Sequence, residues 1–398
     1  MIKMASSDAA NVIAEKRWAW FAGLLWLLPM LAITVMVVLQ PLKRTVTPSY
    51  HDAVERWQQR KTLYDSDFTA GPQGMNYFPT FVPLFAPYHA LPLRTAEVLW
   101  RWTAAAGLAC GLWCFVRRNA GEFPWRSFAL VSVLGLPLCL GALRNGQANA
   151  HLGATLLLAA FCLAMEYWWG AALLITLAVA IKPLGLAALG LALVSYPRLW
   201  WRLGAAILLV LALPFLTAPE AYVQGQFLIA LHNLRQCSDV TQNRFADLNG
   251  LLRVFGVPLT GEFSLLVRAG AGAGLAVFCG IVVRKLPQLD RALAWLALVA
   301  AYLMIFNPMN EANSYVIFAP AAALWAWRYF QAGRRQLAWT LTIMLVTMSL
   351  MPNLLRPWLG NSFALAWHPA MTIIFLGIVF RELIQQARAM DQIWPGKN

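Results

Sequence analysis

The sequence predicts an all-α integral membrane protein, with roughly twelve transmembrane helices in one bundle and further helices in loops at the outer face. Of its 398 residues, 60% are hydrophobic and 12% are charged, which is more apolar surface than one soluble core can bury. Apolar stretches of about 15 to 23 residues recur from Trp18 to the C-terminus, close to the length that crosses a bilayer. Several contain Pro or Gly, which membrane helices tolerate when neighbouring helices satisfy the freed backbone groups.

The apolar stretches predict a single domain. We expect it to span residues 18–383, with an N-terminal tail at 1–17 and a C-terminal tail at 384–398, both cytoplasmic. The first apolar run follows Lys16 and Arg17, as in a signal peptide, but it is too long and no small-residue cleavage site follows it. It therefore predicts a retained transmembrane anchor.

Basic residues predict the orientation, because short cytoplasmic loops are enriched in Lys and Arg. With a cytoplasmic N-terminus every inner segment is basic, including those that carry Arg117 and Arg118, Arg198 and Arg202, Arg284 and Lys285, and Arg334 and Arg335. The net charge of +14 is then mostly a topology signal, with some attraction to anionic membrane lipids. It predicts no nucleic-acid partner.

The outer segments hold most of the remaining polar chemistry. Two are long, at about residues 40–94 and 217–264, and four are short, at 144–149, 182–183, 307–313 and 351–362. The apolar runs between them are nearly free of charge, whereas transporters place ionisable groups near the bilayer midplane. The pattern favours an outward-facing site for a ligand with a lipid part and a polar part.

Asp52 is the first candidate residue of this outer face. In "PSYHDAVERW" it begins a segment with apolar or aromatic residues at Ala53, Val54 and Trp57, which predicts an interfacial helix entered from a Ser/His/Asp cap. One interpretation is that Asp52 only caps this helix. The other is that its carboxylate acts as a general base at the mouth of the bundle.

The next segment, "GMNYFPTFVPLFAPYHALP", contains four prolines. They exclude a regular long helix and predict a short broken or re-entrant segment. Tyr77 fits the aromatic belt of a membrane protein. Together with Asn76 it equally fits a sugar subsite, because sugars bind through aromatic faces and amide donors.

The stretch "RNGQANAH", residues 144–151, carries more hydrogen-bonding groups than a turn between two spans requires. Gln147 and Asn149 are candidates for binding a donor phosphate or sugar, and Arg144 for bidentate phosphate binding. The alternative is a purely structural turn in which Asn145–Gly146 supplies the tight bend.

Two further segments contain basic candidates. Lys182 in "AVAIKPLGL" ends an apolar run, where it either snorkels to the interface or contacts a phosphate as a point charge. His232 and Arg235 lie in a stretch that begins as a membrane-surface helix and has a polar centre richer than anchoring requires. Because no His, Cys, Asp or Glu spacing there matches a metal site, we expect neither a metal nor a cofactor.

The order of these pieces resembles family 87 of the polyprenol-phosphate-dependent glycosyltransferases, membrane enzymes of the GT-C superfamily that include bacterial mannosyltransferases. The resemblance covers about residues 50–320. Four motifs carry it: Asp52 with Leu63 and Tyr64 in the first outer loop, "NYFP" from Asn76 ahead of Pro83 and Leu84, "GQAN" from Gly146, and "IKP" from Ile181.

The resemblance implies a GT-C-type helical bundle with a catalytic crevice under the first outer loop. In such enzymes the Asp of that loop is the base, which gives this role to Asp52 and makes Gln147, Asn149 and Lys182 candidates for the donor phosphate or sugar. The donor would be a polyprenyl-phosphate sugar, with mannose favoured, and the acceptor a hydroxyl of a lipid or glycan. The enzyme would lie in the bacterial inner membrane and face the periplasm.

One departure from the family concerns the turn after the apolar run 293–306. Members often carry a His there, whereas this sequence offers Asn310, Glu311 and Asn313. Either an amide replaces that contact, with Asn313 as the candidate, or the protein has drifted in its substrate or its activity. Two other classes stay open at this level: a transporter or flippase of a lipid-linked sugar, and a non-catalytic membrane assembly partner.

Overall fold

The computed structural model describes residues 2–64, 75–236 and 245–393, and every regular element in those ranges is a helix. The principal helices are α1 (Ile2–Leu39), α2 (Thr47–Gln58), α3 (Phe81–His89), α4 (Leu93–Asn119), α5 (Pro124–Asn145), α6 (Ala148–Ala164), α7 (Trp168–Ile181), α8 (Gly185–Ser195), α9 (Trp200–Ala212), α10 (Glu220–Gln236), α11 (Leu248–Val254), α12 (Gly261–Ile281), α13 (Gln288–Phe306), α14 (Ala319–Gln331) and α15 (Arg335–Ile393). A short 3-10 helix, η6 (Ala312–Val316), precedes α14.

Seven helical stretches within the described ranges are long and apolar enough to cross a membrane. The three apolar helices α6, α7 and α8 are shorter, with 17, 14 and 11 residues. At 1.5 Å per residue they extend about 25 Å or less, below the about 30 Å of a hydrocarbon core. The composition fits an integral membrane protein, and the predicted count of roughly twelve spans is not confirmed.

Small residues allow the central helices to approach one another closely. A Cβ at Gly107 of α4 would lie 2.9 Å from the Cβ of Ala154 of α6, and one at Gly153 would lie 3.0 Å from the backbone oxygen of Val316. Helix α13 is buried along most of its length, with Trp295 fully inaccessible. These contacts place α6 among α4, α7 and α13.

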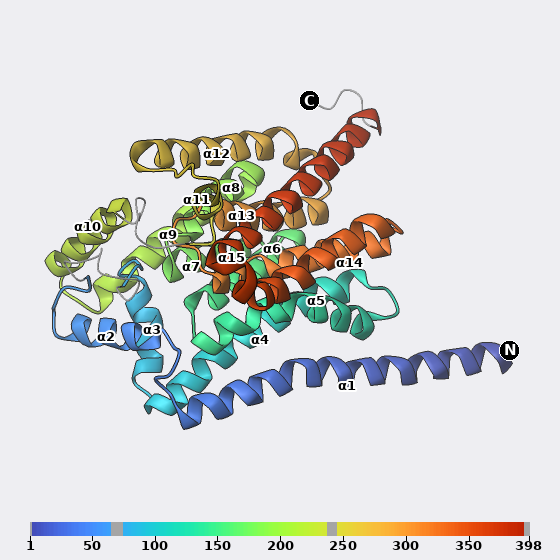
Figure 1. Ribbon diagram of the computed structural model, residues 1–398, viewed down its shortest axis with the longest axis horizontal. Coiled ribbons are helices and arrows are strands. Elements are labelled where there is room, and N and C mark those ends of the chain that lie inside the picture. The colour runs from blue at the N-terminus through green and yellow to red at the C-terminus, as the bar shows by residue number, and fades with distance from the viewer. Residues whose placement is uncertain (1, 65–74, 237–244, 394–398) are drawn as a thin grey trace.

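The helices of the predicted outer loops gather at one end of the molecule. Figure 1 shows α2, α3 and α10 together at this end, with the start of α1 at the opposite end. Helices α1 and α12 run along opposite sides of the bundle. The long axis therefore separates α2, α3 and α10 from the start of α1.

Helix α2 corrects one expectation. It begins at Thr47 with Pro48 in its first turn. Proline is tolerated there because the backbone nitrogens of the first turn have no hydrogen-bond partner within the helix. Asp52 therefore lies in the second turn of the helix and does not cap it. The amphipathic pattern is present as predicted, because Tyr50 and Trp57 are buried on one face.

Candidate functional site

A cavity of about 370 Å³ lies where the predicted outer segments meet. Its walls come from the start of α2, the segment before α3, the first turn of α6, the junction of α7 and α8, α10, and the turn after α13. Five of the predicted site residues line it, namely Asn76, Tyr77, Gln147, Asn149 and Lys182. Segments that are far apart in the sequence therefore contribute to one concave surface, the usual form of a ligand site.

The turn between α5 and α6 depends on Gly146. This residue has φ 63° and ψ 30°, the left-handed conformation that glycine favours after a helix. A Cβ there would lie 2.8 Å from Thr47 Cγ2 and 2.9 Å from Arg101 Nη2, so a larger residue would also collide. The tight turn brings Gln147 and Asn149, at the start of α6, to the cavity.

Lys182 follows the last residue of α7. Because Pro183 disfavours helical conformation in the residue before it, Lys182 is extended, with φ −155° and ψ 141°. Its Nζ donates a hydrogen bond to Asn149 Oδ1 at 3.0 Å and lies 5.6 Å from the centre of the Tyr77 ring, within cation–π range. It is the only cationic side chain among the described residues that line the cavity.

We refer to Gln147, Asn149, Lys182, Glu311 and Ser314 as the cavity network. Asn149 Nδ2 donates to Ser314 Oγ at 3.1 Å and, at the longer distance of 3.5 Å, to Gln147 Oε1. Gln147 Nε2 donates to Glu311 Oε2 at 2.8 Å. The Asn149 amide thus has one donor on its oxygen and two acceptors on its nitrogen, which uses both of its hydrogens. Asn149 therefore positions Lys182.

Aromatic side chains form another wall. The hydroxyl groups of Tyr50 and Tyr77 lie 2.8 Å apart, and Tyr50 also accepts a hydrogen bond from the backbone nitrogen of Ala148 at 3.2 Å. Burial raises the pKa of Tyr50 to about 12, so this hydroxyl is neutral near neutral pH. Asn76 Oδ1 is buried and has no hydrogen-bond partner among the described residues, which leaves an acceptor available to a ligand.

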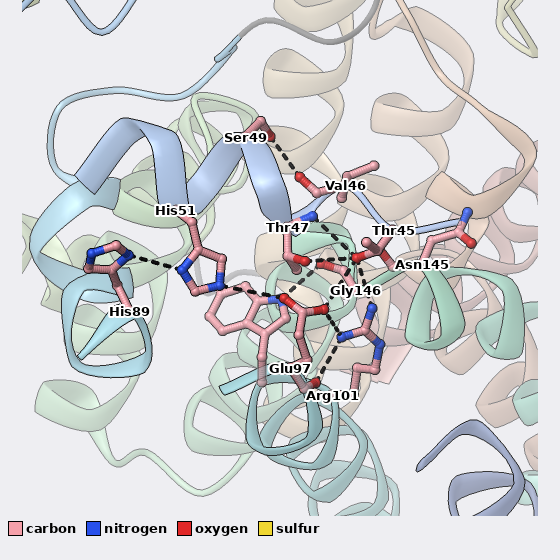
Figure 2. Close-up of polar contacts among 11 residues, drawn as sticks. Thr45, Val46, Thr47, Ser49, His51, His89, Glu97, Arg101, Asn145 and Gly146 are labelled. Atoms are coloured by element: carbon pink, nitrogen blue, oxygen red, sulfur yellow. Dashed lines mark hydrogen bonds and ion pairs between the residues drawn. The ribbon is translucent and has the colours of Figure 1, made fainter. Parts of the chain in front are cut away.

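A second group of polar residues lies under α2, and we refer to Thr45, Thr47, His51, Glu97 and Arg101 as the buried network (Figure 2). Arg101 Nη1 and Glu97 Oε2 form an ion pair at 2.6 Å with both side chains 1% exposed. Arg101 Nη2 also donates to Thr45 Oγ1 at 2.9 Å, and Glu97 Oε1 lies 3.5 Å from His51 Nε2. None of these five described residues lines the cavity.

The buried network supports the backbone of the α5–α6 turn. Arg101 Nε donates to the backbone oxygen of Arg144 at 3.1 Å, and Trp100 Nε1 donates to that of Gly146 at 2.8 Å. The backbone oxygen of Asn145 accepts from the nitrogen of Val46 at 3.0 Å. The carbonyl groups of the turn therefore accept hydrogen bonds from Arg101, Trp100 and Val46. The side chains of Gln147 and Asn149, which follow the turn, belong to the cavity network.

Four predicted site residues lie elsewhere. Asp52 is on the exposed side of α2, where its carboxylate is 53% exposed and pairs with Arg56 Nε at 2.7 Å. Arg144 and His232 are exposed and do not line the cavity. Asn313 packs toward α5, where a Cβ at Gly141 would collide with its Oδ1. The base role of Asp52 stays a prediction, and the side chain of Arg235 lies outside the described residues.

Glu311 is the cavity residue that the sequence did not single out as a site residue. It is the only carboxylate among the described residues that line the cavity. The position of Glu311, a charged residue after a long apolar run and a turn at Pro308, was a signal for a site residue. The family resemblance favoured Asn313 in the same turn instead. Within the described ranges, no group of three or more His, Cys, Asp and Glu side chains has an arrangement suited to a metal ion.

Comparison with known proteins gives one clear match. No curated protein sequence matches the chain. The model of glycosyltransferase family 87, however, matches residues 76–352, which is well over half of the chain and includes Gln147, Asn149, Lys182 and Glu311. Asp52 and all of α2 precede the matched segment. With all-helical architecture and several apolar helices of membrane-spanning length, the chain belongs to glycosyltransferase family 87, a GT-C-type family of membrane glycosyltransferases.

Proposed function

We propose that the protein transfers a sugar, with mannose favoured, from a polyprenyl-phosphate donor to a hydroxyl of a lipid or glycan acceptor. The reaction would take place in the cavity, on the periplasmic side of the bacterial inner membrane. The observation that carries the proposal is Lys182, a cation that Asn149 holds at the surface of the cavity. The other described lining residues are uncharged apart from one carboxylate.

The two kinds of lining suit the two parts of such a donor. Lys182 offers a point charge to a phosphate. For the sugar, Asn76 offers an amide whose oxygen has no hydrogen-bond partner among the described residues, and Tyr77 offers an aromatic ring. Leu186 and Leu234 also line the cavity, and Leu186 is 48% exposed, so this side suits the start of a prenyl chain.

The reaction is a displacement at the anomeric carbon. The acceptor oxygen forms a bond to that carbon, the bond from the carbon to the phosphate oxygen breaks, and its electron pair leaves with the polyprenyl phosphate. The hydroxyl proton passes to a carboxylate base. Negative charge grows on the phosphate during this step, so Lys182 stabilises the transition state more than the bound donor. A single base favours inversion, because retention requires a nucleophilic carboxylate as well.

The experiment measures transfer of radiolabelled sugar by the purified protein in detergent. Polyprenyl-phosphate mannose, glucose and arabinose are supplied in separate reactions with a membrane-lipid extract as acceptor. Lys182→Gln is compared with Lys43→Gln, which removes the same charge from an exposed position outside the cavity. We expect transfer from one donor, lowered about a hundredfold in Lys182→Gln and unchanged in Lys43→Gln.

Two results would contradict the proposal. If the folded wild-type protein forms no glycosidic bond from any donor, a transporter of a lipid-linked sugar becomes the better hypothesis. If Lys182→Gln transfers sugar at the wild-type rate, the cavity is not where the donor phosphate binds.

A further inference from the structure

A second cavity, of about 490 Å³, lies beside the start of α15. One wall is the turn at residues 333–337, which joins α14 to α15, and the other is a later part of α15, at residues 378–382. The two walls meet because α15 is interrupted at Gly360, with φ 76° and ψ 179°, after which the chain returns toward the start of the helix. We refer to this cavity as the arginine pocket, since it is lined by Arg334, Arg335 and Arg381.

The arginine pocket is far from the cavity of the proposed donor site. Ser314 of the cavity network precedes α14, whereas the pocket begins just after α14 ends at Gln331. The 13 residues of α14 extend about 20 Å. Gln331 Nε2 also donates a hydrogen bond to the backbone oxygen of Asn119, the last residue of α4, at 3.1 Å. The pocket therefore lies at the end of the bundle that the basic segments predict to be cytoplasmic.

The positive charges of the pocket are only partly neutralised. Its described lining contains three guanidinium groups and one carboxylate, so its net charge is +2. Arg334 Nη1 forms an ion pair with Glu382 Oε2, and Glu382 Oε1 accepts a hydrogen bond from Gln386 Nε2 at 3.0 Å. Within the described part of the chain, the side chains of Arg335 and Arg381 form neither an ion pair nor a hydrogen bond. Two cations are therefore left for a ligand.

The chemistry of the pocket suits a phosphate group. The planar guanidinium group matches the oxygens of a phosphate in bidentate geometry. Gln336 and Leu337, in the first turn of α15, also line the pocket. Because the first backbone nitrogens of a helix have no partner within it, this turn adds partial positive charge to that of the arginines.

Exposed apolar side chains beside the pocket indicate where such a phosphate comes from. Phe330 and Trp339 lie on either side of the turn, with ring centres 5.5 Å apart, and both are exposed. Ile374 and Ile384, which adjoin the other wall, are exposed too. A phospholipid can place its acyl chains on this surface while its headgroup lies among the cations. A soluble phosphate would use only the second of these features.

We propose that the arginine pocket binds the phosphate of an anionic glycerophospholipid of the membrane. The phosphate lies between Arg335 and Arg381 beside the start of α15, and the acyl chains lie along Phe330 and Trp339. The pocket and the cavity of the proposed donor site have no described lining residue in common. This inference therefore does not depend on the proposed sugar transfer.

The test measures retention of radiolabelled phosphatidylglycerol by the purified full-length protein in a neutral detergent. The pocket variant, Arg335→Gln with Arg381→Gln, removes the two cations and leaves the ion pair of the pocket intact. The control variant, Arg117→Gln with Arg118→Gln, removes two exposed cations at the end of α4, outside the pocket. Radiolabelled phosphatidylcholine and radiolabelled inorganic phosphate are supplied in separate experiments.

We expect the wild-type protein to retain phosphatidylglycerol but neither phosphatidylcholine nor inorganic phosphate. Affinity for phosphatidylglycerol falls about thirtyfold in the pocket variant, because two cationic contacts to an anionic lipid are lost, and is unchanged in the control variant. Thermal unfolding is a second readout. Phosphatidylglycerol raises the unfolding temperature of the wild type and of the control variant more than that of the pocket variant, and unfolding without lipid shows that all three proteins are folded.

Three results would overturn the proposal. Equal affinity of the wild type and the pocket variant would show that the lipid does not bind at Arg335 and Arg381. Equal losses in the pocket and control variants would show that binding follows the total charge of this end of the bundle. Retention of inorganic phosphate as strong as that of phosphatidylglycerol would make the ligand a soluble phosphate.

Discussion

The cavity network and the buried network meet at the α5–α6 turn, and each contains one cation and one carboxylate. In the buried network Arg101 and Glu97 are in direct contact at 2.6 Å and 1% exposed. In the cavity network Lys182 and Glu311 are joined through amides and border a cavity. Because Arg101 and Glu97 are in direct contact, each neutralises the charge of the other, and the pair supports the fold. The second arrangement presents both charges to a ligand, so it supports chemistry.

The largest effect predicted from this comparison is on stability. Arg101→Met leaves Glu97 buried without its ionic partner, and breaking a buried pair in this way costs about 3–5 kcal/mol. We expect the free energy of unfolding in detergent to fall by that amount. The double variant Glu97→Gln with Arg101→Met should lose less, because no charge remains buried. Equal stability of the single variant and the wild type would show that the buried network does not support the fold.

The next effect is on transfer rather than stability. Replacing Gln147 and Asn149 together with Ala removes the amides that orient Lys182 and Glu311, and loss of such a contact costs about 3 kcal/mol, or a hundredfold in rate. The transfer assay measures the loss, and thermal unfolding checks that the protein stays folded. Gln224→Ala, on the exposed face of α10, is the control. Unchanged transfer would make the turn merely structural.

Gly146 lies between the two networks, so its replacement should disturb both. Alanine in the left-handed conformation costs about 1–3 kcal/mol, and the collision with Thr47 and Arg101 adds to it. We expect Gly146→Ala to lower both the unfolding temperature and the transfer rate. Gly121→Ala is the matched control, because Gly121 has φ 60° but no heavy atom within 4 Å of its Cβ position. Equal losses in the two variants would show that only backbone strain matters.

The sequence predicted the helical membrane class and part of the cavity network, but not the buried network. Polar residues at the ends of apolar runs, among them Gln147, Asn149 and Lys182, pointed to the cavity because loops at one end of a bundle converge. The family resemblance is confirmed by the match over residues 76–352. Helix lengths were less predictable, because an apolar run does not reveal whether its helix stops early inside the bundle, as α7 does before Pro183.

The buried network was not predictable from the sequence. Glu97 and Arg101 are one turn apart on α4, a spacing that is also common on exposed helix faces, and only tertiary packing buries them. Asp52 and Glu311 show the same limit. Both are carboxylates in outer segments, and the direction in which each side chain points depends on where α2 begins and on the cap of η6.

The smallest predicted effect concerns Tyr50, which lies between the cavity and the buried network. Tyr50 lines the cavity, while its neighbour His51 contacts Glu97. Tyr50→Phe keeps the ring packed but removes hydrogen bonds to Tyr77 and Ala148, at a cost of about 1 kcal/mol. Burial raises the pKa of Tyr50 from 10.0 to about 12. The folded protein therefore holds this proton more tightly than the unfolded chain does.

The contribution of Tyr50 to stability is then fully present below pH 10 and is lost as the pH rises toward 12, because ionisation favours the unfolded chain. The free energies of unfolding of wild type and Tyr50→Phe, measured in parallel across this range, should differ by a constant amount below pH 10, and wild type should lose its advantage above pH 10. A difference that already changes near neutral pH would mean that the hydroxyl ionises in the folded protein, and that Tyr50 belongs with the reactive groups of the cavity rather than with its walls.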